Sequence, residues 1–402
     1  MKEIAIVFGG ESVEHDVSIL TAIQFMNAMD GERYGVLPVY VGPDGRWWTG
    51  KALRDKKFYP LTPATEKNLT RLRLPGNSIR GQQPYFLGDK KGVFSKPQTI
   101  PFDLVVPAIH GSNGEDGTLQ GLLEFLGIPF AGCNVLAAAA TMNKDFTKQV
   151  VKAHGVPTLA HLVLTKPNQA STLDPKTIKK ALQESLGKNP FPLIVKPCNL
   201  GSSIGVTPAQ DMDDLLAGLL LCFRLDHAVI IEPFVQNLVE YNVAVSKAFG
   251  ETRVSVIERP LKENDFLDFK GKYLSGDSQG SKLKTGNSEG MASLNRVMNP
   301  PELNQSKQEK IKGWAGSAFD ALGLAGSVRI DFLGDEKTGE IWLNEINTIP
   351  GSFAYYLWQE STPSVSFTEL TTALIEEGLV RAESNLSETD KGLGGAVIFK
   401  DK

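Results

Sequence analysis

The sequence predicts an α/β protein of two or three domains that begins with an open, mostly parallel β-sheet. Its 402 residues are more than one compact hydrophobic core usually holds. In the first third of the chain, short apolar runs alternate with helical patterns, which is typical of a parallel sheet. The elements expected here are strands at 3–8, 34–41 and 103–109 and helices at 19–29 and 118–127. Ligands of such sheets bind at the carboxyl ends of the strands.

The rest of the chain predicts two further α/β regions. Residues 260–300 are rich in Lys, Gly, Ser and Asn, and irregular segments of this length are often active-site lids or disordered. Residues 384–395 are expected to form a polar surface segment before a last short strand, AVIFK. The other expected elements are an alanine-rich helix from about residue 135 (VLAAAATMNKDFTKQVVKAHG), strands at 160–165, 191–197, 227–234, 238–246 and 252–258, helices near 176–186, 210–222 and 301–322, and a hairpin over 326–347.

Composition restricts the partners of the chain. A formal net charge of −4 gives no electrostatic reason to expect nucleic acid or an anionic membrane surface. Three cysteines are too few for a disulfide framework and lack metal-ligand spacing, which suits a reducing compartment. The N-terminus starts directly in a predicted strand without a signal-peptide pattern, and the longest apolar stretch, 215–223, is too short to span a bilayer. We therefore expect a soluble, cytoplasmic protein.

The predicted hairpin carries three oxygen donors that indicate a metal site. Asp331 follows Arg329 by two residues, and Glu345 precedes Asn347 by two, and side chains two apart on a strand share a face. If the hairpin closes at residues 334–340, these groups converge. Such donors suit Mg²⁺, which binds one or two carboxylates together with substrate phosphates. The alternative is a hairpin with a solvated, charged face.

Two loops after predicted strands indicate nucleotide contacts. Lys196 ends one strand, and the Gly- and Ser-rich loop 200–206 that follows lets backbone N–H groups approach phosphate oxygens. The loop lacks the spacing of a P-loop and also fits an ordinary strand-to-turn connection. Glu232 and Glu240 lie at the ends of neighbouring predicted strands. A carboxylate here could bind the ribose hydroxyls of a nucleotide, and the backbone edge beside it could bind the adenine. They also fit the polar ends of ordinary strands.

Two turns in the first third of the chain carry polar side chains. One turn holds Glu14 and His15, and the other holds His110. Both turns directly follow predicted strands of the first sheet, so they belong to one candidate crevice. The side chains fit a binding edge for a small charged substrate. They fit capping and turn chemistry equally well.

Taken together, these segments resemble the D-alanine–D-alanine ligases of the ATP-grasp superfamily. The matching motifs, in the family order, are FGGESVEHDVS, HGSNGEDGTLQGLLEFLGIPFAGC, MNKDFTK, PLIVKPCNLGSSIGV, the EPF…VE pair, FLDFKGKYLS, VRIDFL and NEINTIPG. The resemblance implies a three-domain ATP-grasp architecture. The expected domains are an N-terminal substrate domain at 1–135, a central ATP-grasp subdomain at 136–232 and a C-terminal subdomain at 233–402 with a lid at 260–300.

The resemblance also implies the reaction and its residues. ATP phosphorylates the carboxylate of one D-alanine, and the amine of a second D-alanine attacks the acyl phosphate to give the dipeptide used in peptidoglycan. The implied ATP contacts are Lys144, Lys196, Ser202, Ser203, Glu232, Phe234, Val235, Glu240, Lys272, Phe332 and Asn344. Two Mg²⁺ ions, with Mn²⁺ as an alternative, would bind Asp331, Glu345 and Asn347. The implied catalytic and substrate-binding residues are Glu14, His110, Ser202, Tyr273, Arg329, Gly351, Tyr356 and Leu357. A homodimer is also expected.

Several positions depart from the family pattern. Tyr356 stands where the family has a serine that holds the carboxylate of the second substrate, Leu200 replaces a common acidic residue, and Asn143 replaces an aspartate. Tyr273 matches family members that use an amine acceptor rather than a hydroxy acid. Two alternatives follow: a ligase of the same chemistry with another acceptor, such as D-serine, D-lactate or another amino acid, and a non-catalytic ATP-binding protein of the same fold.

Overall fold

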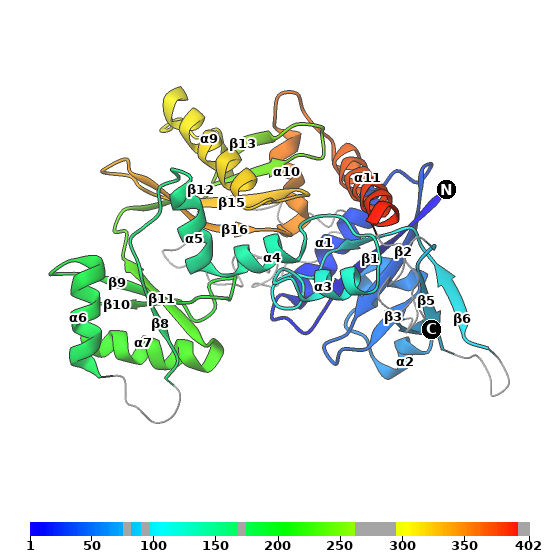
Figure 1. Cartoon of the computed structure of the whole chain (residues 1–402), viewed down its shortest axis with the longest axis horizontal. Coiled ribbons are helices and arrows are strands. Elements are labelled where there is room, and N and C mark those ends of the chain that lie inside the picture. Colours follow the sequence, from blue (N-terminus) through cyan, green and yellow to red (C-terminus); the bar gives the residue numbers. More distant parts are fainter. Residues whose placement is uncertain (75–81, 90–95, 168–173, 262–294, 393–402) are drawn as a thin grey trace, which may run out of the picture.

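The computed structural model describes residues 1–74, 82–89, 96–167, 174–261 and 295–392, and the statements below concern these residues. They form three β-sheets with helices packed on them. Figure 1 shows the first sheet at the right, the second at the lower left and the third above and between them. Lys272 and Tyr273 of the predicted lid and the predicted strand AVIFK lie outside the described residues. No helix among the described residues has the length and apolar character needed to cross a bilayer.

The first sheet has the strand order β6-β5-β4-β3-β2-β1-β7. Its strands are β1 (Lys2–Gly9), β2 (Tyr34–Val41), β3 (Trp47–Thr49), β4 (Thr70–Arg73), β5 (Tyr85–Gly88), β6 (Gln98–Pro101) and β7 (Leu104–Pro107). Only β1, β2 and β7 are parallel to one another, and the other neighbours pair antiparallel. The expectation of a mostly parallel sheet is therefore wrong outside these three strands, which carry the two turns of the predicted crevice.

Helices cover both faces of the first sheet. They are α1 (His15–Ala28), α2 (Pro63–Glu66), α3 (Thr118–Phe125) and, much later in the chain, α11 (Phe367–Gly392), with 3₁₀ turns η1 (Lys51–Arg54) and η2 (Lys56–Phe58). Strand β1 is buried on both sides, with Ile4, Ile6 and Phe8 in one cluster and Ala5 and Val7 in another. A central parallel strand reads as an unbroken apolar run for this reason.

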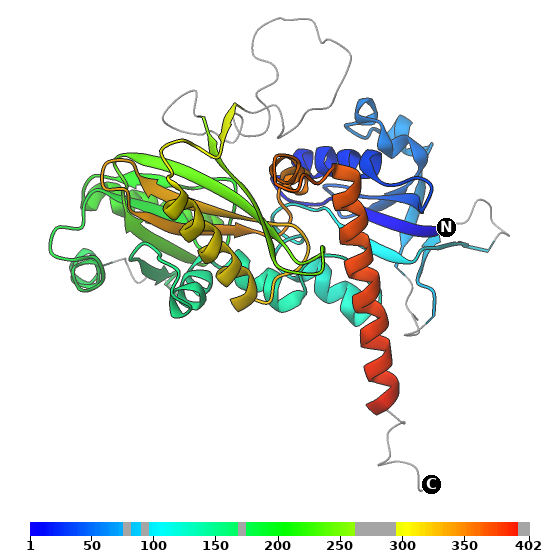
Figure 2. The same ribbon diagram turned by 90° about the horizontal axis from the view of Figure 1, so that it is seen from above.

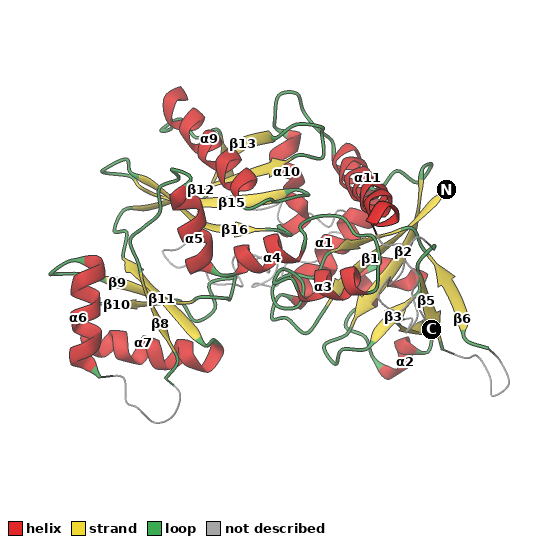
Figure 3. Cartoon of the chain, in the orientation of Figure 1, coloured by secondary structure: helices red, strands yellow, loops and turns green. Residues whose placement is uncertain are grey.

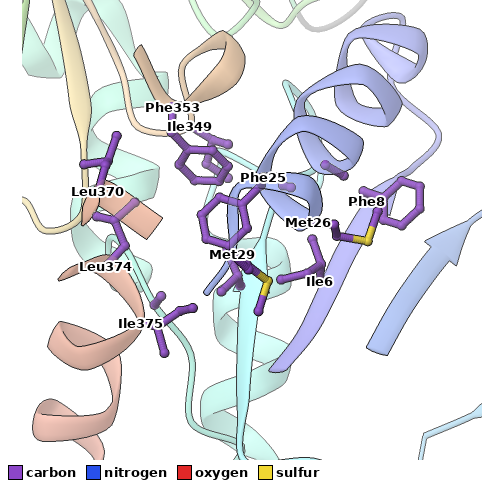
Figure 4. Close-up of a cluster of buried hydrophobic side chains, with 14 of the residues drawn as sticks. Ile6, Phe8, Phe25, Met26, Met29, Ile349, Phe353, Leu370, Leu374 and Ile375 are labelled. Carbon is purple, nitrogen blue, oxygen red and sulfur yellow. The ribbon is translucent and has the colours of Figure 1, made fainter. Parts of the chain in front are cut away.

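The C-terminal part of the chain returns to the first sheet. Phe25 of α1 packs on Phe353 with ring centroids 4.8 Å apart, and Leu370 and Leu374 of α11 belong to the same cluster (Figure 4). Helix α11 leaves this core and runs away from the body of the molecule (Figure 2). Residues 384–392 of the expected polar surface segment continue α11, and their exposure stays a prediction.

The second sheet is antiparallel, with the strand order β10-β9-β11-β8. Its strands are β8 (Leu162–Thr165), β9 (Leu193–Pro197), β10 (Thr207–Ala209) and β11 (Ala228–Pro233), and α6 (Pro175–Leu186) and α7 (Met212–Leu225) cover one face (Figure 3). Side chains alternate along a strand. Leu193 and Val195 accordingly face the helices, whereas Ile194 and Lys196 face the third sheet.

The third sheet is also antiparallel and has the order β14-β13-β12-β15-β16. Its strands are β12 (Leu238–Ser246), β13 (Arg253–Pro260), β14 (Arg296–Met298), β15 (Val328–Asp335) and β16 (Ile341–Asn347). One face packs on α4 (Val135–Met142), α5 (Lys144–Ala153) and α9 (Gln305–Ala321). After β16 come a 3₁₀ turn, η4 (Gly351–Ala354), and α10 (Tyr355–Gln359).

The expected single alanine-rich helix is wrong, because Asn143 divides it into α4 and α5. Its backbone is extended, with φ −88° and ψ 106°, and its side-chain oxygen accepts a hydrogen bond from the Phe146 N–H at 2.9 Å. This is the bonding pattern of a helix N-cap. As a consequence, Lys144 occupies the first position of α5, beside the loop that follows β9.

Candidate active site

A cleft of about 940 Å³ lies between the second and third sheets. Its walls hold polar side chains because the inner face of each sheet carries them at alternate strand positions. Nine of the eleven predicted ATP contacts line this cleft: Lys144, Lys196, Ser203, Glu232, Phe234, Val235, Glu240, Phe332 and Asn344. Of the other two, Ser202 lies at the neighbouring pocket and Lys272 lies outside the described residues.

Glu232 anchors two lysines at the inner end of the cleft. Its carboxylate contacts Lys148 at 2.7 Å and Lys196 at 2.5 Å, and both Glu232 and Lys148 are 1% exposed. Burial alone would raise the pKa of Glu232, but the two ammonium groups outweigh it and hold this pKa at about 2. Burial lowers the pKa of Lys148. The carboxylate fixes Lys196, which also reaches Asn344 Oδ1 at 3.2 Å, in a position that faces the cleft.

A β-bulge brings two neighbouring residues of β16 to the cleft. Asp331 pairs with Glu345 across the hairpin, but Phe332 pairs with Leu343, so Asn344 is the extra residue. A bulge of this kind redirects side chains that strict alternation would send to opposite faces. Asn344 and Glu345 both line the cleft, while Leu343 stays fully buried in the core.

Arg329 and Asp331 form a buried, two-pronged ion pair on β15. Arg329 Nε and Nη2 each donate to one oxygen of Asp331 at 2.7 Å. The Asn347 amide nitrogen donates to the same carboxylate at 3.0 Å. The convergence that the hairpin pattern predicted for Arg329, Asp331, Glu345 and Asn347 is therefore present in the structure.

A smaller pocket of about 440 Å³ adjoins the cleft and shares Lys144, Leu200 and Glu345 with it. Glu14 lies in this pocket and accepts a hydrogen bond from Ser202 Oγ. Gly111 must be a glycine here, because its φ is +71° and a Cβ would lie 2.3 Å from the Glu14 carboxylate. Burial raises the pKa of Glu14, the Ser202 hydrogen bond opposes this rise, and the charge of Glu345 adds to it.

Glu115 also lines this pocket, and the buried His110 directly precedes Gly111. Glu115 accepts backbone N–H groups from Gly111 and Ile349, each at 2.8 Å, and so links the first sheet to the turn after β16. Burial, with the charge of Glu14, raises the pKa of Glu115 to about 8. His110 Nε2 lies 2.9 Å from Thr21 Oγ1, and burial followed by the charge of Arg329 lowers its pKa to about 3. His110 is therefore neutral near pH 7.

The turn after β16 is left-handed and held by α1. Ser352, Phe353 and Ala354 have φ of 55°, 52° and 54°, a region that costs a non-glycine residue about 1 kcal/mol or more. Thr21 Oγ1 accepts the Ser352 N–H at 3.1 Å, and Ser327 Oγ donates to Phe353 O at 2.8 Å. These bonds fix the backbone next to Gly351 and direct α10 back toward Arg329.

The two predicted substrate residues of α10 have different surroundings. Tyr356 is 5% exposed, and its hydroxyl lies beside Arg329 and 3.4 Å from Glu258 Oε1. Leu357 is fully buried in the hydrophobic core, and its role in substrate binding stays a prediction.

Four residues of the site were not predicted from the sequence: Lys148, Glu115, Asn242 and Glu258. Lys148 follows Lys144 by four residues, so the two share a helix face, and this spacing was a usable signal. Asn242 and Glu258 sit within strand patterns that give no sign of which polar residue faces a cleft. Their roles emerge only from the pairing of β12 with β13 and β15.

The donor set at the hairpin fits Mg²⁺. The Asp331 and Glu345 carboxylates, from paired strands, line the cleft, and Asn347, whose amide nitrogen donates to Asp331, lines the adjoining pocket. Within the described part of the chain, no group of three or more His, Cys, Asp or Glu residues is arranged to hold a metal ion alone. Mg²⁺ prefers such incomplete sites, because substrate phosphates and water supply its remaining ligands.

A cleft between two antiparallel sheets, with lysines on one wall and paired carboxylates on the other, is typical of the ATP-grasp class. The family models described as D-ala D-ala ligase N-terminus and D-ala D-ala ligase C-terminus match residues 3–133 and 150–376. The chain belongs to the D-alanine–D-alanine ligase family.

Relatives and solved structures agree with this assignment. The chain is 35% identical to a D-alanine–D-alanine ligase of Thermosipho melanesiensis over 95% of its own length and 94% of the relative. It is 32% identical to one of Acetivibrio thermocellus, with 97% and 99% covered. Among solved structures, the D-Ala:D-Ser ligase VanG of Enterococcus faecalis has a TM-score of 0.73 at 26% identity, with 94% of this chain and 99% of that chain covered. The D-alanine–D-alanine ligase of Helicobacter pylori has a TM-score of 0.64 at 28% identity, with 93% and 99% covered.

Proposed function

We propose that this chain is an ATP-dependent ligase that joins two D-alanines through an acyl phosphate and supplies the dipeptide to peptidoglycan synthesis. The observation that carries the proposal is that the cleft between the second and third sheets and the Glu14 pocket meet at Lys144 and Glu345. A phosphate donor in the cleft and a small amino acid at Glu14 would therefore face each other across the paired carboxylates of the hairpin.

The proposed reaction begins with the donor D-alanine bound through its ammonium group to ionised Glu14. One donor carboxylate oxygen attacks the γ-phosphorus of ATP, the bond to ADP breaks, and an acyl phosphate forms. Lys144 and Lys196 hold the phosphate oxygens, since positioning and charge stabilisation are the main protein contributions to phosphoryl transfer. Mg²⁺, held by Asp331, Glu345 and Asn347 together with phosphate oxygens, would neutralise the charge that develops on the transferred group.

The second half of the reaction joins the acceptor. Its amine, once deprotonated, attacks the acyl carbon and forms a tetrahedral intermediate with a negatively charged oxygen. Arg329 and the backbone N–H of Gly351 stabilise this oxygen, and the donor oxygen leaves with the phosphate. Lys272 and Tyr273, from the segment outside the described residues, remain predicted contacts of the γ-phosphate and of Ser202.

A second candidate is a ligase with another acceptor, such as D-serine or D-lactate. Tyr356 near Arg329 motivates it, because a bulky side chain stands where the family has serine. VanG, a structural neighbour, is described as a D-Ala:D-Ser ligase. The non-catalytic alternative is less well supported, because the described side chains that we propose to hold phosphate, metal and donor line the cleft and the Glu14 pocket. The cytoplasmic location, the homodimer, the use of Mn²⁺ and the lack of a nucleic-acid partner stay predictions.

The test of this function is ADP formation by the purified chain with a panel of D-amino acids and hydroxy acids, with products identified by mass. We expect D-alanyl-D-alanine as the main product. Glu345→Gln should lower turnover by about 10³-fold or more, since a metal contributes several kcal/mol to charge stabilisation. Glu336→Gln, in the exposed turn of the same hairpin, is the matched control and should retain activity. ATP binding without D-alanine-dependent ADP release, or near-normal turnover of Glu345→Gln, would contradict the proposal.

A further inference from the structure

One face of helix α1 carries polar side chains that are buried in the molecule. Ser18, Thr21 and Gln24 are 0%, 1% and 8% exposed, and they follow Glu14, the residue that precedes the helix. Residues three and four apart in a helix lie on the same face. We refer to Ser18, Thr21 and Gln24 as the polar face of α1. Because buried polar groups are normally hydrogen-bonded, their partners show which segments this face holds.

The polar face of α1 bonds to three loops around the proposed site. Ser18 Oγ accepts the Gly9 N–H at 2.7 Å and donates to Ala108 O at 2.6 Å. It thereby joins the chain at the ends of β1 and β7. At the other end of the face, Gln24 Oε1 accepts a hydrogen bond from Ser352 Oγ. The face therefore extends from the Glu14 side of the site to the turn after β16.

Thr21 makes the central contacts of this face. Its Oγ1 accepts the Ser352 N–H at 3.1 Å and lies 2.9 Å from His110 Nε2. Since a backbone N–H can only donate, the Thr21 hydroxyl keeps its own hydrogen, which Nε2 can accept. This arrangement assigns the ring hydrogen of His110 to Nδ1. Burial lowers the pKa of His110 to about 3, so the ring is neutral near pH 7 and Nε2 can accept.

The turn that Thr21 holds has an unfavourable backbone conformation. Ser352, Phe353 and Ala354 are three consecutive non-glycine residues with positive φ, and such conformations persist only where the surroundings impose them. Packing of Phe353 on Phe25 of α1, with ring centroids 4.8 Å apart, is one such constraint (Figure 4). The Thr21 bond is another. Without it the Ser352 N–H, in a residue 2% exposed, would lose its acceptor, and the turn would have to shift.

The position of the Gly351 N–H depends on the same turn. The peptide group between Gly351 and Ser352 is planar and carries the N–H that Thr21 accepts, so Thr21 fixes the peptide next to the Gly351 N–H. In the proposed reaction the Gly351 N–H must lie about 3 Å from the negatively charged oxygen of the tetrahedral intermediate. A misplacement of about 1 Å can lower such a rate by about 10²-fold.

We propose that Thr21 is a positioning residue for the second half of the reaction. Its hydroxyl, oriented by His110, holds the turn after β16 so that the Gly351 N–H meets the oxygen of the tetrahedral intermediate. The inference rests on the proposed function, and it gives His110 a positioning role in place of the predicted substrate contact. Helix α1 then serves both halves of the reaction: Glu14 before its first residue binds the donor, and its polar face supports the joining step.

The test separates the two halves by rapid-quench kinetics. Purified protein with ATP and Mg²⁺ is mixed with D-alanine, and ADP and D-alanyl-D-alanine are measured through the first turnover. ADP reports phosphorylation of the donor, and the delay of the peptide behind ADP gives the rate constant of the joining step. Thr21→Val keeps the shape of the side chain but removes the hydroxyl. It should lower the joining rate by about 10- to 100-fold and change the rate of ADP formation by less than about threefold.

Three further variants keep this test decisive. Thr21→Ser retains the hydroxyl, and its joining rate should stay within about threefold of the wild type. Thr371→Val is the matched control, because Thr371 is also fully buried and its Oγ1 donates to Thr368 O at 3.0 Å and, at 3.4 Å, to Ala28 O at the end of α1. It should leave both rates unchanged. Thr21→Ala removes the same hydroxyl with a smaller side chain, and it replaces Thr21→Val if that variant does not fold.

A wild-type joining rate in the variant without the hydroxyl would overturn the inference. So would a variant in which both steps slow by the same factor, because that is the effect of a general structural defect. In either case the wild-type chain would still make the peptide, and the proposed function would stand. Failure of the wild-type chain to form ADP and peptide from D-alanine would count against the proposed function itself.

Discussion

The carboxyl group of Glu115 is half-buried and that of Glu232 is fully buried, and folding moves their pKa values in opposite directions. On the donor side of the site, burial and the nearby Glu14 raise the pKa of Glu115 to about 8. On the nucleotide side, burial also acts on Glu232, but Lys148 and Lys196 hold its pKa at about 2. Glu115 has two backbone N–H partners and no adjoining lysine, whereas Glu232 has two ammonium groups within 2.7 Å.

The difference shows that the partners of a buried carboxyl group decide its charge, while the type of residue does not. A fixed negative charge at Glu232 keeps two lysines in place where phosphate oxygens are expected. A raised pKa at Glu115 keeps the total negative charge low in the pocket that it shares with Glu345, where the donor carboxylate must approach. The two sides are thereby suited to an anionic nucleotide and to a zwitterionic amino acid.

The largest expected effect concerns the nucleotide side. Glu232→Gln leaves Lys148 buried without a counter-ion, and breaking a buried ion pair in this way costs about 3–5 kcal/mol of the free energy of unfolding. Chemical denaturation at pH 7 would measure it. Glu240→Gln is the matched control, because Glu240 lies on the same cleft but is partly exposed, and it should cost less than about 1 kcal/mol. A loss below about 1 kcal/mol for Glu232→Gln would contradict the comparison.

A smaller effect is expected on the donor side, in the pH dependence of stability. Because the pKa of Glu115 rises from 4.5 to about 8 on folding, the folded state binds more protons than the unfolded chain between these values. Stability should therefore fall as the pH rises from 6.5 to 8. The titration of His110 falls mainly outside this window. Its lowered pKa makes stability increase with pH only between about 3 and 6.5.

Glu115→Gln should remove about 1.6 kcal/mol of that decline, measured by urea denaturation across the window. Glu124→Gln, on the exposed face of α3, is the control and should keep the wild-type profile. A wild-type profile that is flat or rising from pH 6.5 to 8 would refute the assignment.

The smallest effect is expected from Ser202→Ala. The hydroxyl of Ser202 donates to the Glu14 carboxylate and lowers its pKa, so its removal should raise that pKa further. Donor binding needs ionised Glu14, and kcat/KM for the donor should fall at a higher pH in the variant, by less than about one pH unit. Ser203→Ala removes the neighbouring hydroxyl and should not change the pH at which kcat/KM for the donor falls on acidification. If kcat/KM for the donor fell at a lower pH in Ser202→Ala than in the wild type, the proposed role of the Ser202–Glu14 hydrogen bond would be contradicted.

Sequence patterns predicted the central elements of the fold but missed the antiparallel strands β3, β4, β5 and β6 at one edge of the first sheet. Strands β1 and β2 are eight residues long and consist mostly of apolar residues, which is a strong signal. Strands β4 and β6 have four residues each and are mostly exposed, so they show neither alternation nor an apolar run. Helix α11 was also missed. Its last residues are mostly polar in the sequence, and they extend a helix that the buried residues Leu370 and Leu374 already stabilise.

The site was predictable where its residues lie close in the sequence and was missed where sheet pairing brings them together. Arg329 with Asp331, and Glu345 with Asn347, are two apart on strands, so their shared face follows from the backbone alone. The bulge at Asn344 breaks this rule, and no turn or glycine signal announces it. The ion pair of Glu258 with Arg296 joins residues 38 apart, across strands whose pairing no local pattern fixes.

The central claim is that a donor carboxylate is phosphorylated between the Glu14 pocket and the nucleotide cleft. The most direct test uses D-alanine labelled with ¹⁸O in both carboxylate oxygens, ATP and the purified wild-type chain. If an acyl phosphate forms, the released inorganic phosphate should carry one ¹⁸O atom for each peptide made, because the leaving oxygen comes from the donor. Peptide formation with unlabelled phosphate would contradict the account.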